Sequence, residues 1–227
     1  MSWENFDWLD FELGEYQGSL HHRVHQAYNA AYRVLEGEYQ KARKKLEEDL
    51  KAPKGEDDYT AQIIEFEDYR WLEQQEALAA MALTLLASRT KSFLNEQKSR
   101  NLDKSHPRKQ ERYAGSSELQ RRVTEYKERF GVDLEKIEYF AAVREVELAR
   151  DSCVHREGVP ENDYLNKTAK RLLDEHGNIN ITPKLLDTFI AELSGFADAL
   201  SKVMKEIRKA AAEKKDEKQP VEKPEAK

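Results

Sequence analysis

The chain has 227 residues, of which 36% are charged and 39% apolar, with a net charge of −6 and a mean hydropathy of −0.90. The apolar residues recur periodically, so the composition indicates one helical domain with charged outer faces rather than a disordered chain. The single cysteine excludes an internal disulfide framework and a cysteine-based zinc cluster, and it fits a reducing, cytoplasmic location. Neither a signal peptide nor an apolar stretch of about 18 residues, as a membrane span requires, is recognisable.

The first 15 residues combine acids with large apolar side chains, and they predict an arm that is either an aromatic clip docked on the body or a disordered, partner-binding peptide. The clip is the favoured alternative. Apolar residues at helical spacing then predict long helices over about 18–51 and 59–98. Residues 77–87 are apolar all round except Thr84, which predicts a buried central helix rich in Ala and Leu or, equally, a dimer interface.

The stretch 98–122 reverses the acidic balance of the chain, because it holds eight Lys or Arg and three acids. It is either a solvated loop or a local patch that contacts phosphate, whereas the overall acidity argues against a broad nucleic-acid coat. The residues predicted to contact RNA are Arg108, Lys109, Arg112, Arg121 and Arg122. No metal site is predicted, since the histidine pair His21 and His25 has no neighbouring Glu or Cys to complete one.

The second half of the chain predicts shorter helices over 117–130, from about 133 to the turn at Gly158 and Pro160, and over 162–173. A short extended piece is predicted at 178–181, and Thr182 is the predicted N-cap of a last long helix. The fold class is therefore an all-α, up-and-down bundle of long helices. Its predicted parts are an arm over 1–15, a helical domain over 16–210 and a disordered, charged tail over 211–227.

The candidate site lies at the end of the helix predicted from 133. On a helical wheel Arg150 falls in an apolar stripe that includes Tyr139, Val143, Val146, Cys153 and Val154. A guanidinium stays charged, so its burial requires a partner, and the simplest explanation is a pair with a neighbouring acid or with the last carbonyls of the helix. His155 lies about 140° further round, so joint action with Arg150 predicts that the helix unwinds near Cys153.

The run Arg150-Asp151-Ser152-Cys153-Val154-His155 ends a helix and is followed by a glycine-containing turn. It resembles the Arg-x4-6-His signature of the HEPN superfamily (higher eukaryotes and prokaryotes nucleotide-binding domain). The order of elements is also similar, and the resemblance covers roughly residues 18–208. It points to the stand-alone members from microbial defence and toxin systems.

The resemblance implies a metal-independent endoribonuclease without a cofactor, a homodimer that brings two motifs into one cleft, RNA as substrate and a protein regulator or antitoxin as partner. It assigns catalysis to Arg150, Asp151 and His155. A histidine can act as acid or base near neutral pH, and a fixed guanidinium stabilises charge on the attacked phosphate. Two positions depart from the family: Asp151 stands where a neutral Asn is frequent, and Glu157 stands where the branch with nucleotidyltransferase antitoxins has Tyr. The alternative is a non-catalytic helical interaction or regulatory module.

Overall fold

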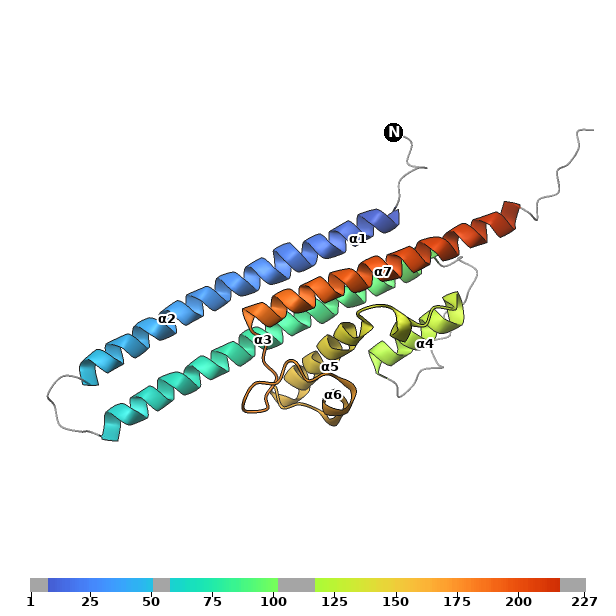
Figure 1. The fold of residues 1–227 in the computed structure, drawn as a ribbon. Helices are drawn as coiled ribbons and strands as arrows, with labels where there is room; N and C mark the ends of the chain where they lie inside the picture. The colour runs from blue at the N-terminus through green and yellow to red at the C-terminus, as the bar shows by residue number, and fades with distance from the viewer. Residues whose placement is uncertain (1–7, 51–57, 102–116, 217–227) are drawn as a thin grey trace, which may run out of the picture.

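The fold begins with one long helical rod and its return. A computed structural model describes residues 8–50, 58–101 and 117–216, and over these residues the chain is an all-α bundle, as predicted. The rod consists of α1 (Trp8–Ser19), the π-helix η2 (Leu20–His25) and α2 (Gln26–Leu50). The second long helix, α3 (Asp58–Asn101), runs back along the rod (Figure 1).

Shorter elements and one last long helix complete the bundle. They are α4 (Glu118–Phe130), the 3-10 turn η4 (Leu134–Lys136), α5 (Phe140–Arg156), α6 (Asn162–Lys167) and α7 (Pro183–Asp216). In Figure 1, α4, α5 and α6 lie on the side of α3 that is away from α1 and α2. α5 packs against both α3 and α7, so the candidate site is attached to the two longest single helices.

A continuous apolar core holds these layers together. Its largest fully buried side chains include Tyr126, Tyr164, Phe93, Phe189 and Phe196. The middle of α3 contributes six buried residues, which are Leu78, Ala79, Ala82, Leu83, Leu86 and Ala87. The predicted buried central helix is confirmed by these positions, although Met81 in the same segment is 48% exposed.

Both ends of the described chain are more helical than the sequence predicted. The first helix begins at Trp8 rather than near residue 18, so the predicted arm over 1–15 contributes its second half to the bundle. The reason is a buried stripe at four-residue spacing, Tyr16, Leu20, Val24 and Tyr28, whose N-terminal end lies in α1. At the other end α7 extends to Asp216, which makes the first six residues of the predicted tail helical.

Local caps set several helix boundaries near the predicted positions, and Thr182 is the N-cap that was predicted. Ser117 Oγ accepts a hydrogen bond from the Gln120 amide at 3.2 Å, and Gly131 ends α4 with φ of +68°. Thr182 Oγ1 accepts from the Leu185 amide at 3.3 Å and caps α7. The helix predicted from 133 begins later, at Phe140, because η4 and Tyr139, which has φ of +63°, interrupt it. The helix predicted over 162–173 ends at Lys167.

Candidate functional site

The end of α5 is fixed by hydrogen bonds to the loop that follows it. Ser152 Oγ donates to the Leu148 carbonyl at 3.0 Å and accepts from the Glu161 amide at 3.1 Å. The chain turns at Gly158, which has φ of +87° and whose carbonyl accepts from the Ile179 amide at 2.8 Å. Ser152 therefore positions the motif, a role that was not predicted from the sequence.

The motif residues lie at the end of an intact helix. α5 stays helical to Arg156, so the predicted unwinding near Cys153 is wrong. Asp151 and His155, at positions i and i+4, are neighbours on the helix surface, as are Arg150 and Val154, whereas Arg150 and His155 are about 140° apart round the intact helix. The side chains of Arg150 and Asp151 are 25% and 33% exposed, Val154 is 53% exposed and His155 is exposed. We call these four residues the α5 patch; Asp151 lies between the guanidinium and the imidazole.

Two carboxylates hold the Arg150 guanidinium. Its Nη2 donates to Glu147 at 3.2 Å, and its Nη1 lies 3.1 Å from an Asp151 oxygen. The apolar stripe predicted around Arg150 is only partly correct, since Val143 and Val146 are buried while Tyr139 and Val154 are exposed. Arg150 thus lies at the edge of the buried face and is paired with acids, as the simplest interpretation of the sequence had it.

Of the five basic residues predicted to contact RNA, the structure describes Arg121 and Arg122. Arg122 is only 6% exposed and donates to Glu118 at 2.6 Å, so its guanidinium joins α4 internally rather than facing a phosphate. Glu118 also pairs with Lys91 of α3. Arg121 is exposed on α4, and the other three, Arg108, Lys109 and Arg112, lie outside the described residues.

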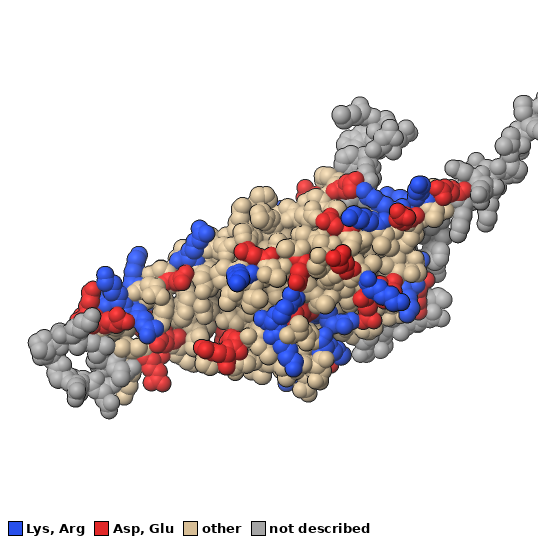
Figure 2. Space-filling view, in the orientation of Figure 1, with Lys and Arg blue, Asp and Glu red and all other residues tan. Residues whose placement is uncertain are grey.

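A small hollow of about 60 Å³ lies between α4, α5 and α6, and Arg150 and Asp151 line it whereas His155 does not. Its charged lining is Glu118, Glu135, Glu147, Asp151 and Asp163 against Arg144, Arg150 and Lys167. The excess of acids disfavours a phosphate inside the hollow. On the face shown in Figure 2, basic and acidic side chains are likewise interspersed.

Burial changes the acidity of the two carboxyls that bind Arg150. It raises the pKa of Glu147 above its ordinary value of 4.5, and the guanidiniums of Arg150 and Arg122 oppose this rise. It also raises the pKa of Asp151 above 3.8, against the opposing charges of Arg150 and His155. Both carboxyls therefore hold their protons more tightly in the folded chain than in the unfolded one.

This difference predicts how stability depends on pH. At a pH between the pKa of the unfolded chain and that of the folded chain, these carboxyls bind more protons in the folded chain than in the unfolded one. Their contribution to the free energy of unfolding therefore falls as the pH rises above about 4. Replacing Glu147 with Gln is expected to make this fall shallower, because Gln cannot ionise. Urea unfolding at pH values from about 4 to 8 measures the slope.

The matched control is Glu135→Gln, since the Glu135 side chain lines the same hollow but is 47% exposed. We expect this variant to keep the slope of the wild type. If Glu147→Gln also kept it, the Glu147 carboxyl would have the same pKa in the folded and unfolded chains.

Comparison with known proteins adds no assignment: no family model, no curated protein and no solved structure matches this chain. Within the described ranges, no helix combines the length and the apolar character that crossing a membrane requires. The same residues contain no cluster of three or more His, Cys, Asp or Glu side chains that could hold a metal ion.

Proposed function

We propose that the chain is a HEPN-like, metal-independent endoribonuclease of the microbial defence and toxin type, whose site is the α5 patch completed by a second copy of the chain. The supporting observation is that Asp151 lies between the other two residues at the end of α5: its carboxylate is 3.1 Å from the Arg150 guanidinium, and the exposed His155 follows it by four residues on the same helix face. In this proposal His155 exchanges protons with the attacking 2′-hydroxyl and the leaving 5′-oxygen. Arg150 stabilises the charge on the phosphate, and Asp151 orients the imidazole.

The second copy is part of the proposal because a single chain leaves the patch incomplete. Val154 and Val159 are each 53% exposed on the two sides of His155 in the sequence. A second chain packed here would bury these apolar side chains and add its own Arg150 and His155 to the first pair. Four groups around one cleft would also offset the acids that hold each Arg150.

The second candidate is a non-catalytic helical module, and it is favoured by the pairing of Arg150. A guanidinium held by both Glu147 and Asp151, beside a hollow with more acids than bases, is what a structural role for Arg150 would produce. In that case the charged groups join α4 to α5, and His155 is an ordinary surface histidine.

Cleavage of a labelled pool of total RNA in the presence of EDTA tests the two candidates. The wild type is compared with His155→Ala and with the control His176→Ala, which replaces another exposed histidine, on the loop before α7. We expect the first substitution to reduce the rate at least about a hundredfold, as the loss of a general acid or base does, and the second to leave it unchanged. Circular dichroism verifies that both variants are folded.

Each other outcome has a definite meaning. If all three proteins cleave RNA equally, the α5 patch is not the site. If the wild type is a dimer by light scattering and still leaves the RNA intact, the non-catalytic module is the better description.

A further inference from the structure

A larger pocket, of about 340 Å³, lies between the α1–η2 segment and α3. It is on the side of α3 opposite α4, because Lys91 and Lys98 of α3 reach α4 from the other side of the helix. Its volume is within the range of about 300–1,000 Å³ that small-molecule sites occupy. The pocket is therefore separate from the α5 patch and large enough for a ligand of its own.

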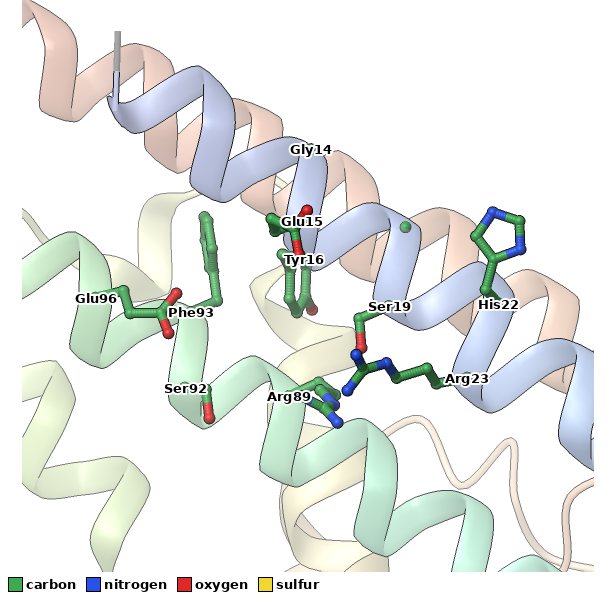
Figure 3. A pocket seen from close by; sticks show the side chains of 11 residues that line it. Gly14, Glu15, Tyr16, Ser19, His22, Arg23, Arg89, Ser92, Phe93 and Glu96 are labelled. Atoms are coloured by element: carbon green, nitrogen blue, oxygen red, sulfur yellow. The ribbon is translucent and has the colours of Figure 1, made fainter. Parts of the chain in front are cut away.

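Two arginines face each other across this pocket. Figure 3 shows Arg23 from η2 and Arg89 from α3 pointing toward one another near Ser19. In the part of the chain that the structure describes, neither guanidinium forms an ion pair, whereas Arg122, Arg150 and Arg171 each do. The lining also holds Glu15 and Glu96, but among the described residues neither forms an ion pair with these arginines, so an anion between the two guanidiniums would be stabilised.

A third group in the pocket lacks a partner as well. Ser19 Oγ is buried and has no hydrogen-bond partner among the described residues. A buried hydroxyl without a partner costs free energy, and it can donate to an anion held by the two arginines. The hydroxyl and the guanidiniums thus supply donors from both walls of the pocket.

The backbone is irregular at the same place. η2 is a π-helix in which the Gln26 amide donates to the His21 carbonyl, five residues earlier, and it carries His22 and Arg23 into the pocket lining. Such turns are uncommon and occur frequently at functional sites. Tyr16 and Phe93 also line the pocket, and their rings stack with centroids 4.7 Å apart.

We propose that this pocket binds a small phosphate monoester that carries hydroxyl groups. Two guanidiniums match the two charges of a phosphoryl group, whereas a carboxylate would need only one, and Ser19 donates to a further phosphate oxygen. The pocket is much larger than a phosphate ion, and Glu15 on its lining offers an acceptor for the hydroxyl groups of the ester. This proposal does not depend on RNA cleavage or on His155.

Titration calorimetry with ribose 5-phosphate, inorganic phosphate and ribose tests the proposal on the full chain. We expect the ester to bind, phosphate to bind more weakly and ribose not to bind. Arg89→Met is expected to weaken binding of the ester at least tenfold, and Arg89→Lys to weaken it less, because Lys keeps the charge but cannot bind two oxygens at once. The control Arg33→Met removes an exposed arginine outside the pocket and is expected to bind as the wild type does.

The thermal unfolding midpoint, measured with and without the ester, verifies that each variant is folded and reports binding a second time. Equal affinity of the wild type and Arg89→Met would place the ester elsewhere and overturn the proposal. Absence of binding by the wild type at millimolar ester would overturn it too. If inorganic phosphate bound as tightly as the ester, the hydroxyl-bearing part of the ester would make no contribution to binding. If ribose bound as tightly as the ester, the phosphoryl group would make none.

Discussion

Replacing Glu145 with alanine is expected to lower the free energy of unfolding by about 3–5 kcal/mol, because three hydrogen-bond donors lose a buried, charged acceptor. Glu145 is 1% exposed on α5. It accepts hydrogen bonds from the Arg171 amide at 2.6 Å, from Arg171 Nε at 2.9 Å and from the Tyr164 hydroxyl at 3.1 Å. Without the carboxylate these donors lose their acceptor inside the fold.

The effect is expected to be large because Arg171 connects three elements. Its guanidinium also donates to both carboxylate oxygens of Glu192 on α7, at 2.7 and 2.9 Å, and lies 4.4 Å from the centre of the Phe189 ring. Arg171 lies in the loop between α6 and α7, so loss of Glu145 removes hydrogen bonds that hold this loop to α5. Hydrogen exchange is expected to show this as faster exchange of the amides of Arg171 and Leu172.

Urea unfolding measures the loss, and Glu135→Ala is the control. Glu135 also pairs with an arginine, Arg144, but its side chain is 47% exposed, and exposed pairs contribute about 0–1 kcal/mol. A loss below about 1 kcal/mol for Glu145→Ala would contradict the prediction, because it would equate the buried carboxylate with the exposed one.

Contacts between residues close in sequence were the predictable part of this structure. The caps at Ser117 and Thr182 and the glycine at position 131 each act within about one helical turn, so the sequence carries their full signal. The start of α5 was missed because the turn before it depends on Tyr139 adopting φ of +63°. The Tyr139 ring covers Gly195 of α7, a contact that local sequence does not reveal.

The same distinction separates the two candidate sites. Arg150 pairs with acids three residues before it and one after it, and such pairing could be anticipated from the sequence. Arg23 and Arg89 are 66 positions apart in the numbering and meet only because α3 returns along the rod next to η2. No propensity rule marks η2 as a π-helix, so the pocket could not be predicted.

Tyr126 is the site of the second large expected effect, because it anchors α4 to α3. Its ring is 1% exposed, and its hydroxyl donates to the Leu94 carbonyl at 2.7 Å. Tyr126→Ala is expected to cost about 3–5 kcal/mol, as removal of a buried aromatic side chain does. Tyr126→Phe keeps the ring and leaves only the carbonyl without its donor, which is expected to cost about 1–3 kcal/mol.

Urea unfolding measures the free energy of unfolding of both variants, and together they separate the contribution of the Tyr126 ring from that of its hydroxyl. The control is Tyr69→Ala, because Tyr69 is 60% exposed. Because this anchor holds α4 to α3, Tyr126→Ala is expected to speed hydrogen exchange in α4 before the rest of the bundle. Glu118 of α4 lines the same hollow as Arg150 and Asp151. If Tyr126→Phe were as stable as the wild type, the bond to Leu94 would make no net contribution, and α4 would be held by apolar packing and its ion pairs alone.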